Sequence, residues 1–600
     1  MPTDDQRLRH TAHWQDTYVM PAYASLAEWE PRKDAIRQQV LFAAGLLPFP
    51  QKTPLNPLVT GTTHHEGFDV DNVAFESFPG FYCTGNLYRP HRPVDPERIP
   101  IVLTPHGHWQ EGRFAHTERG SIPARCINFA RQGYYAFAPD MVGYNDSRQI
   151  GGHRTFDADA LAQWSIGTLG LQLWNNIRAL DYLLTLPGAD PSRVACTGES
   201  GGATQTYLLA AVDDRVAVSA PVNMLSAHYA GGCVCENAPG LRIDLTNMEI
   251  IASFAPRPQL IVAATGDWTV NTPRVEYPAV RSIYQLYGAD DSLECVQFDA
   301  PHNYNLASRQ AVYGFLAKHL GGRAEPATHH PTTSFNALQS TPLAETEGSE
   351  IADVGPLRTF PNSLPPSALD GPSAVVDAAK KFLAADPTHP DLPAAYQLAV
   401  GAALPSADDV AFARRDKLEA PDRNVERFQL STRRHGEHLP AVLIRPSATT
   451  NAPPVLLLHG DGKRAFLDGA HPRPGELSAL LAAGRTVLTL DLFLTGDYLS
   501  PVSQTGRPAS ETHFTGYNRT DDALRVQDVL TALAALSHLT GASRVDLIAR
   551  GAAALWATLA RPLAGDLIAG FQTDDPQPFA AGCFIPHLAR LGGVSAAGAL

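Results

Sequence analysis

The stretch from Arg193 to Gln205 constrains this chain more than any other. A short apolar run, Val194 to Cys196, is followed by Gly-Glu-Ser-Gly-Gly at residues 198–202 and then by a helix-forming segment from Thr204 to Ala211. Glycines on both sides of Ser200 permit a sharp, strained turn at which strand and helix approach closely. A strand, a sharp turn and a helix in this order predict a serine hydroxyl exposed at the carboxyl end of a buried strand, an arrangement called a nucleophile elbow.

Apolar runs and helical patterns alternate on both sides of this turn. A hairpin is expected around Pro79-Gly80, and a helix is expected where leucine and isoleucine recur at helical spacing between residues 173 and 184. The expected strands of the sheet are residues 101–104, 134–138, 194–196, 216–218, 259–264 and 293–298. Strands that alternate with helices of this length predict an α/β fold, a mostly parallel sheet with helices on both faces.

The length of 600 residues is too great for a single hydrophobic core, so at least two domains are expected. Residues 1–60 are predicted to form a helical extension, and residues 61–322 the first α/β domain. Residues 323–372 are rich in proline, serine, threonine and histidine and show weak periodicity, which predicts a linker. Residues 373–600 are predicted to form the last domain.

Three landmarks of the first domain return in the last domain in the same order. Pro454 to Gly460 resembles Pro100 to Gly107, Gly484 to Asp491 resembles Gly133 to Asp140, and Ser543-Arg544-Val545 resembles Ser192-Arg193-Val194. This pattern predicts a diverged internal duplication. Gly551 stands where the serine would be, and about fifty residues follow it, so the second copy is predicted to be degenerate and non-catalytic.

Composition and charge exclude several classes of partner. The formal net charge of −14 argues against nucleic acid. The sequence has no segment apolar enough to span a bilayer and no apolar leader, so no membrane partner is expected. The seven scattered cysteines are expected to be free thiols, which suits the cytoplasm, although a leader removed beforehand would leave the same sequence. A homo-oligomer is left open.

A serine hydroxyl is a weak nucleophile and needs a base that is itself oriented by a carboxylate. After an elbow of this kind, the acid and then the histidine are expected at the ends of later strands. Asp267 follows the apolar run 260–264, and His302 follows the run 293–298. Ser200, Asp267 and His302 are therefore the predicted catalytic residues.

Each of these residues also has an ordinary structural explanation, since Asp267 could cap a helix and His302 could be a solvated loop residue. Their joint occurrence in the required order favours the catalytic interpretation. Glu294 and Asp299 are the alternative acids. Glu294 lies within a predicted strand, and Asp299 is too near His302 in sequence to come from another loop, so Asp267 is preferred.

Two backbone N–H groups are needed to stabilise an oxyanion. The N–H of Gly201 is the first predicted donor, and the N–H of His108 or Trp109, in the loop after residues 101–104, is the second. His106 in the same loop is expected to pack beneath the site. Side chains that could contact substrate or belong to the core are Tyr144, Glu199, Trp268 and Tyr304.

A glycine-rich segment before the strand of Asp267 could hold a metal ion. Its possible ligands are Cys233, Cys235, Glu236 and nearby His228. The segment lacks a second Cys-x-x-Cys and a matched pair of histidines. A pocket loop with buried thiols is therefore the preferred interpretation, and neither a metal nor an organic cofactor is expected.

Residues 60–320 resemble the α/β-hydrolase superfamily through the segment 198–202, Asp267 and His302 in that order. More narrowly, the chain is similar to the bacterial acetyl xylan esterase and dienelactone hydrolase-like branch, in a tandem form with a degenerate second module. The segments that carry this similarity are 105–109, 140–147, 266–269 and 300–304. The resemblance implies a serine carboxylesterase that forms an acyl-enzyme and acts on short-acyl, acetyl esters of small molecules or carbohydrates. Serine in place of the cysteine of dienelactone hydrolases favours oxygen esters.

Two other functions are considered. A serine peptidase of the prolyl oligopeptidase type would share the elbow, but its usual propeller requires blade repeats that the sequence does not contain. A non-catalytic binding scaffold would need no Ser/Asp/His set, so the presence of that set argues against it.

Overall fold

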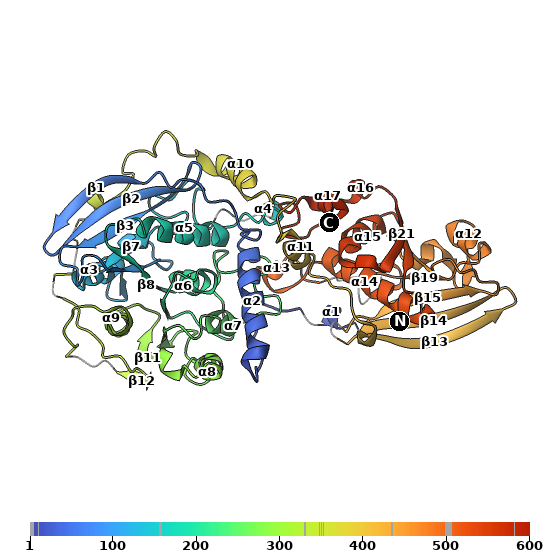
Figure 1. Cartoon of the computed structure of the whole chain (residues 1–600), viewed down its shortest axis with the longest axis horizontal. Coiled ribbons are helices and arrows are strands. Elements are labelled where there is room, and N and C mark those ends of the chain that lie inside the picture. The colour runs from blue at the N-terminus through green and yellow to red at the C-terminus, as the bar shows by residue number, and fades with distance from the viewer. Residues whose placement is uncertain are drawn as a thin grey trace. The chain divides into compact units, whose positions relative to one another are not determined.

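The structure is a computed structural model that describes residues 5–9, 11–154, 156, 159–328, 332–346, 348–349, 351, 353–433, 436–498, 507–580 and 582–599. The chain separates into two compact units (Figure 1). The first unit is Trp14–Leu383, and the second unit combines Met1–His13 with Ala384–Leu600. Among the described residues, no helix combines the length and the apolar character that crossing a membrane requires.

A ten-stranded mixed sheet forms the centre of the described part of the first unit, in the order β1-β2-β3-β7-β4-β8-β9-β10-β11-β12. Its strands are β1 (Leu58–His65), β2 (Phe68–Phe78), β3 (Phe81–Pro90), β4 (Ile99–Leu103), β7 (Tyr135–Pro139), β8 (Ala189–Glu199), β9 (Val218–Val222), β10 (Gln259–Gly266), β11 (Leu293–Pro301) and β12 (Thr333–Asn336), and a small ribbon joins β5 (His116–Thr117) to β6 (Gly120–Ser121). The strands from β7 to β11 are parallel, whereas β1, β2, β3 and β12 pair antiparallel. The predicted hairpin at Pro79-Gly80 joins β2 to β3.

Helices cover both faces of this sheet (Figure 1). They are α2 (Leu26–Ala43), α3 (Ile122–Arg131), α4 (Asp159–Ala162), α5 (Thr168–Leu183), α6 (Gly201–Val212), α7 (Asn247–Ala252), α8 (Glu276–Leu286), α9 (Leu306–Leu320) and α10 (Gly371–Leu383). On one face, Ile127 of α3 and Phe315 of α9 pack in one core with Val102 of β4. On the other face, Tyr182 of α5 packs on Phe137 of β7, with ring centroids 6.4 Å apart. Neighbouring residues of a strand point to opposite faces, which is why these apolar strands need helices on both sides. The α/β fold class is thereby confirmed.

The predicted N-terminal extension, residues 1–60, divides between the two units. Its first helix, α1 (Gln6–Arg9), belongs to the second unit, and α2 belongs to the first. Helix α2 begins at Leu26 because the side chain of Ser25 accepts a hydrogen bond from the Glu28 N–H and caps the helix. Trp29 is fully buried, so this helix is an integral part of the first unit.

Residues 323–372, the predicted linker, are attached to the first unit. The short strand β12 pairs antiparallel with β11, with Val296 opposite Asn336. Further along, Glu345 accepts hydrogen bonds from Arg309 of α9, the shorter of them 2.6 Å long. The helix that follows, α10, also belongs to the first unit. The segment is held by contacts with β11 and Arg309 and not by a regular element of its own, which explains its weak periodicity.

The second unit contains, among its described residues, a seven-stranded sheet in the order β13-β14-β15-β19-β16-β20-β21. Its strands are β13 (Val410–Ala420), β14 (Arg423–Thr432), β15 (Leu439–Pro446), β16 (Val455–His459), β19 (Val487–Leu490), β20 (Val545–Arg550) and β21 (Ile568–Thr573), with a ribbon of β17 (Leu467–Asp468) and β18 (His471–Pro472). Its longer helices are α11 (Leu392–Val400), α12 (Glu476–Ala482), α14 (Asp521–Thr540), α15 (Ala553–Ala560) and α17 (Gly593–Ala599), and its single-turn helices besides α1 are α13 (Phe514–Tyr517) and α16 (Gln577–Ala580). The strand order repeats, place for place, the order β1-β2-β3-β7-β4-β8-β9 of the first unit.

Candidate active site

Ser200 is the single residue between β8, which ends at Glu199, and α6, which begins at Gly201. Its φ of 56° and ψ of −124° are strained for a residue with a side chain. The Ser200 N–H donates to the carbonyl of Val222 on β9 at 3.1 Å, which holds the turn against the sheet. The predicted strand-turn-helix is therefore present.

Glycines let the loop after β4 approach this turn. A Cβ atom on Gly198 would lie 2.3 Å from the carbonyl oxygen of Pro105, and one on Gly202 would lie 2.4 Å from the same atom. A Cβ atom on Gly107 would lie 2.8 Å from the carbonyl oxygen of Glu199. Only glycine fits at these places, so the sequence Gly-x-Ser-x-Gly is required here by packing as well as by chain geometry.

Replacing Gly198 with alanine is therefore expected to lower the free energy of unfolding of the first unit by roughly 1–3 kcal/mol, the usual effect of overpacking. The backbone of Pro105 would have to move, and a rigid loop resists that movement. Urea unfolding followed by tryptophan fluorescence measures the change. Gly232→Ala is the matched control, because its nearest new contact would be an ordinary 3.4 Å. Equal stabilities of the two variants would contradict the packing argument.

Asp267 and His302 follow the neighbouring strands β10 and β11 and are hydrogen-bonded to each other. The Nδ1 atom of His302 lies 2.7 Å from Oδ2 of Asp267. The other carboxylate oxygen, Oδ1, accepts from the N–H of Thr269 at 2.7 Å and from its hydroxyl at 2.5 Å. Since the carboxylate can only accept a hydrogen bond, Nδ1 of His302 carries the proton. Nε2 of His302 therefore has a lone pair with which it can act as a base.

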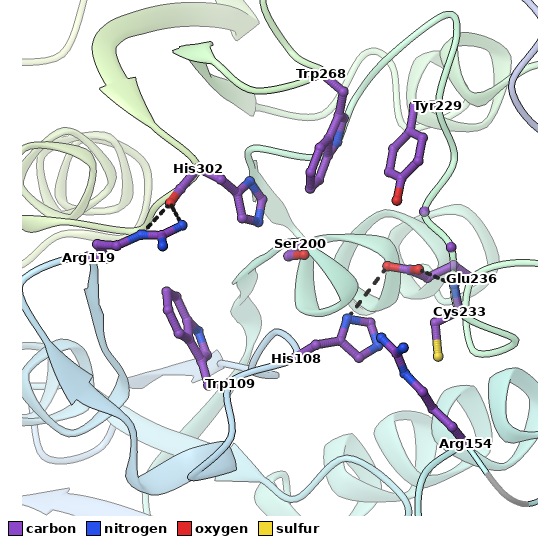
Figure 2. Close-up of a pocket in the computed structure, with 12 residues that line it drawn as sticks. His108, Trp109, Arg119, Arg154, Ser200, Tyr229, Cys233, Glu236, Trp268 and His302 are labelled. Atoms are coloured by element: carbon purple, nitrogen blue, oxygen red, sulfur yellow. Dashed lines mark hydrogen bonds and ion pairs between the residues drawn. The ribbon is translucent and has the colours of Figure 1, made fainter.

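A pocket of about 420 Å³ contains both Ser200 and His302. Its lining residues are His108, Trp109, Arg119, Arg154, Ser200, Tyr229, Gly231, Gly232, Cys233, Glu236, Trp268 and His302. Figure 2 shows Ser200 in the middle of these side chains, between His302 and Glu236. The ring of Trp268 lies over His302 with centroids 4.4 Å apart. The serine, the histidine and the predicted substrate contact Trp268 are thus brought together.

The two alternative acids lie elsewhere. Glu294 is fully buried and accepts from Lys318 at 2.8 Å and from the Ser340 hydroxyl at 2.7 Å. Asp299 accepts from the hydroxyl of Thr265 at 2.7 Å in an exposed position. Neither acid contacts the histidine, so the geometry favours Asp267 as its partner.

The loop after β4 offers one of its two predicted oxyanion donors. The N–H of Trp109 donates to the carbonyl of Gly107 at 2.9 Å and is therefore occupied. The N–H of His108 makes no hydrogen bond within the described part of the chain. His106 packs beneath the site, where burial lowers its pKa to about 3. Of the two predicted donors in this loop, only the N–H of His108 is therefore left without a hydrogen bond in the described part of the chain.

The predicted substrate contact Glu199 requires correction, because it is 1% exposed and lies under the elbow. It forms an ion pair with Arg125 at 2.6 Å and accepts from the N–H of Gly107 at 2.9 Å and from the indole of Trp109 at 2.5 Å. Burial is the largest single effect and raises the pKa of Glu199, but the charge and hydrogen bond of Arg125, together with the hydrogen bonds from Gly107 and Trp109, outweigh it, so the net shift is downward. Glu199 thus joins the elbow to the loop of His108.

Tyr144 and Tyr304, which the sequence left open between substrate contact and core, both lie outside the pocket lining. Tyr304 is 1% exposed, and its hydroxyl lies 2.8 Å from the hydroxyl of Thr197, with the Arg125 guanidinium 4.5 Å above its ring. Tyr144 packs on His153, with ring centroids 5.1 Å apart. Tyr304 lies two residues after His302, and this proximity in sequence did not indicate which side of the backbone its ring occupies.

Sequence reasoning missed several residues that line the pocket. The guanidinium of Arg119 donates to the carbonyl of His302 at 2.7 Å and 3.1 Å, so it holds the histidine loop. Arg154 brings a second cation, and Tyr229 packs on Trp268 with ring centroids 4.8 Å apart. These residues lie in connections between strands, and hydrophobic periodicity does not predict the path of such connections.

A strained serine after β8, an acid after β10 and a histidine after β11 of a mixed sheet define the first unit as an α/β-hydrolase fold. No protein-family model matches the chain. The chain is similar to YtaP of Bacillus subtilis (strain 168), a protein named as a hydrolase, with 24% identity over 241 residues, which are 37% of this chain and 79% of that protein.

The chain is also similar to solved structures of esterases. Methylesterase BT1017 is 32% identical with a TM-score of 0.45, and the match covers 50% of this chain and 66% of that one, slightly less than two thirds of its length. An acetyl xylan esterase from Paenibacillus sp. R4 is 17% identical with a TM-score of 0.35, over 51% of this chain and 98% of that one. A glucuronoyl esterase from Solibacter usitatus is 14% identical with a TM-score of 0.36, over 51% of this chain and 98% of that one.

Proposed function

We propose that the first unit is a serine carboxylic-ester hydrolase whose triad is Ser200, His302 and Asp267. The observation that carries this proposal is the 2.7 Å hydrogen bond between Asp267 and His302 at the edge of the pocket that contains the strained Ser200. A carboxylate that holds an imidazole beside an exposed serine is the arrangement that activates a hydroxyl for attack on a carbonyl.

The proposed reaction uses these residues in turn. Nε2 of His302 takes the Ser200 proton as the hydroxyl oxygen attacks the ester carbonyl, and Asp267 stabilises the imidazolium that forms. The N–H groups of Gly201 and His108 hold the oxyanion, each worth about 3 kcal/mol of transition-state stabilisation. His302 then protonates the leaving alcohol and activates water, which releases the acid from the acyl-enzyme.

We propose a short-acyl ester of a carbohydrate as the substrate. The pocket volume of about 420 Å³ suits a small acyl group with part of a sugar, and Trp109, Trp268 and Tyr229 offer flat apolar faces. The esterases to which the chain is similar include one named for acetyl xylan. Arg119 and Arg154 add two cations at the pocket, which favours a saccharide that carries a carboxylate near the ester.

Arg154→Ala tests this preference. An arginine–carboxylate contact at a partly exposed site contributes about 1 kcal/mol or slightly more, so KM for an acetylated oligosaccharide with uronic acid residues is expected to rise roughly fivefold to tenfold. KM for p-nitrophenyl acetate, which has no carboxylate, is expected to stay within a factor of about two. Arg92→Ala, an exposed arginine outside the pocket lining, is the control. Equal effects on both substrates would contradict an acidic saccharide.

A fluorophosphonate probe distinguishes the enzyme from the alternatives. One label per chain is expected on the wild type and none on Ser200→Ala. A non-catalytic scaffold would stay unlabelled in both forms, and a peptidase would be labelled but would cleave peptides in preference to esters.

We also propose that the second unit is a non-catalytic copy of the first. The support is the repeated strand order and the φ of 58° at Gly551, close to the 56° of Ser200, at the turn between β20 and α15. The backbone at Gly551 thus has a φ similar to that of Ser200, which glycine adopts without strain, and the position carries no hydroxyl. Residual labelling of the Ser200→Ala chain at the second unit would contradict this proposal.

A further inference from the structure

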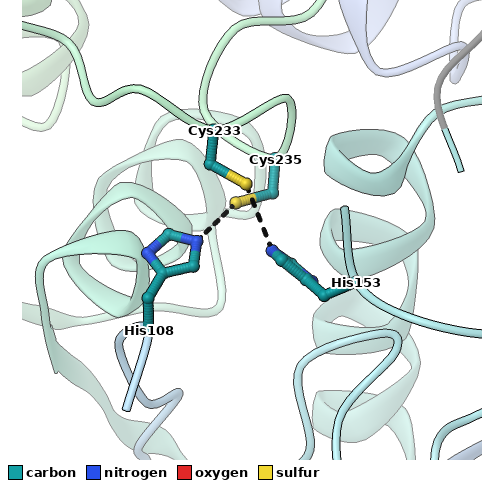
Figure 3. Close-up of side chains that lie close together, drawn as sticks. All are labelled: His108, His153, Cys233 and Cys235. Atoms are coloured by element: carbon teal, nitrogen blue, oxygen red, sulfur yellow. Dashed lines mark hydrogen bonds between the residues drawn. The ribbon is translucent and has the colours of Figure 1, made fainter. Parts of the chain in front are cut away.

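Four side chains from three separate loops meet beside the pocket (Figure 3). They are His108, His153, Cys233 and Cys235, here called the His/Cys cluster, and their ligand atoms all lie within 4.8 Å of one another. We propose that the His/Cys cluster binds one zinc ion. The proposal goes beyond the esterase function and stands independently of it.

The distances within the cluster fit tetrahedral zinc. Nε2 of His108 lies 3.2 Å from Sγ of Cys235, and Nε2 of His153 lies 3.4 Å from Sγ of Cys233. Zinc bonds of about 2.3 Å to sulfur and about 2.0 Å to nitrogen place neighbouring N and S ligands about 3.6 Å apart in a tetrahedron. These two N–S pairs therefore need to separate only by a few tenths of an ångström to admit the ion, and the widest pair, at no more than 4.8 Å, needs to close by roughly 1 Å.

The groups beside the outer ring nitrogens of the two histidines favour the tautomers that bind metal. Nδ1 of His153 lies 2.6 Å from the carbonyl oxygen of Val142, which can only accept, so Nδ1 carries the proton. Nε2 of His153 then directs its lone pair at the cluster, as metal-binding histidines do. Nδ1 of His108 lies 4.0 Å from a carboxylate oxygen of Glu236. A metal-binding histidine usually has either a backbone carbonyl or a carboxylate beside its other ring nitrogen.

The loop that carries both cysteines is fixed by its own hydrogen bonds. A carboxylate oxygen of Glu236 accepts from the N–H of Cys233 at 3.1 Å. The side-chain amide of Asn237 donates to the carbonyls of Gly231 and Cys233 at 2.8 Å and 3.0 Å. The ligands are thus positioned before the ion arrives, which lowers the entropy lost on binding.

The chemistry of the donors selects zinc and a structural role. Thiolate and imidazole ligands disfavour magnesium and calcium, which prefer oxygen. Two thiolates and two neutral imidazoles balance the charge of Zn²⁺, which suits a site where His153, Cys233 and Cys235 are 6%, 3% and 1% exposed. Four protein ligands complete the tetrahedron and leave no open position for substrate, unlike a catalytic zinc.

The zinc proposal differs from the interpretation that was preferred from the sequence. The cysteines do bring buried thiols to the pocket, but the matched histidines lie 127 and 80 residues away, in the loops after β4 and β7. His228, the histidine near the cysteines in sequence, instead lies 3.0 Å from the Ser226 hydroxyl. Glu236 stands behind His108 at 4.0 Å.

Zinc in this position would stabilise the oxyanion donors. The ring of His108 packs so closely on the start of α6 that a Cβ atom on Gly201 would lie 2.6 Å from its Cε1 atom. An ion bound to Nε2 of His108 fixes that ring and thereby the adjacent backbone N–H. His108 is in this respect a positioning residue as well as an oxyanion donor.

Metal analysis of the full-length chain tests the proposal without reference to activity. The reduced protein, purified with zinc and then dialysed, is expected to contain about one zinc ion per chain, and Cys233→Ala and His153→Gln are expected to contain less than about a tenth of that. Cys295→Ala, which removes a buried thiol outside the cluster, is the matched control and should keep the ion. Cobalt added to the metal-free wild type should give the visible bands and thiolate charge-transfer band of a tetrahedral site.

A second measurement on the wild type covers the case in which variants fail to fold. Zinc should protect two thiols from alkylation until a chelator is added, and the chelator should lower the Tm of the first unit. The proposal is overturned if the reduced wild type binds neither zinc nor cobalt. It is also overturned if mass spectrometry finds a disulfide between Cys233 and Cys235 in the folded protein under reducing purification.

Discussion

Replacing Ser200 with alanine is expected to reduce kcat/KM for p-nitrophenyl acetate by about ten-thousand-fold or more, because the triad acts as a unit and its nucleophile has no substitute. The residual rate should be that of the oxyanion donors and substrate binding alone. Initial rates measured over a range of substrate concentrations test this. Asp267→Asn should cause a loss of about ten-thousand-fold, since the amide would hold the wrong tautomer of His302.

A control variant separates loss of chemistry from loss of structure. Asp299→Asn alters an acid near His302 that contacts Thr265 instead, and its kcat/KM is expected to stay within a factor of about three. Circular dichroism should show the same thermal transition for Ser200→Ala and the wild type. A Ser200→Ala enzyme that retained most of the activity while folded would remove this serine from the mechanism.

Replacing Glu199 with alanine is expected to lower the free energy of unfolding of the first unit by about 3–5 kcal/mol, because it leaves the Arg125 guanidinium buried without its partner. The side chains of Arg125 and Glu199 are each 1% exposed. Denaturant unfolding measures the loss. Arg37→Ala, which breaks the exposed pair with Asp214, should cost less than about 1 kcal/mol.

A double variant tests the cause of that loss. Glu199→Leu combined with Arg125→Met removes both charges, and it should be more stable than Glu199→Ala because no unpaired ion remains. If the double variant were as unstable as the sum of the two single changes, the packing of these side chains and not the unpaired charge would explain the effect.

The elbow and the order of the site could be read from the sequence because each depends on local patterns. Glycines around Ser200 dictate a turn. The apolar runs 260–264 and 293–298 end shortly before Asp267 and His302, which places both residues at the carboxyl ends of parallel strands. The fold class followed for the same reason, since the alternation of strands and helices is a property of consecutive residues.

Features made by residues far apart in sequence were not predictable. The arginine that neutralises Glu199 lies 74 residues before it, and sequence adjacency to Ser200 alone suggested a substrate contact. Three strands of the ten-stranded sheet lie in sequence between His108 and the cysteines of the His/Cys cluster, and two lie between His153 and the cysteines. Such groupings arise from the tertiary fold, which brings loops together without leaving a periodic pattern in any one of them.

The short strand β12 has a consequence for how the first unit can be produced on its own. Because β12 pairs along β11, a fragment that stopped at residue 322 would present a bare row of backbone N–H and C=O groups at that border. Such a border invites other chains to add strands, so the fragment should self-associate into insoluble material. A fragment that extends to Leu383 keeps the border covered and should remain monodisperse in light scattering.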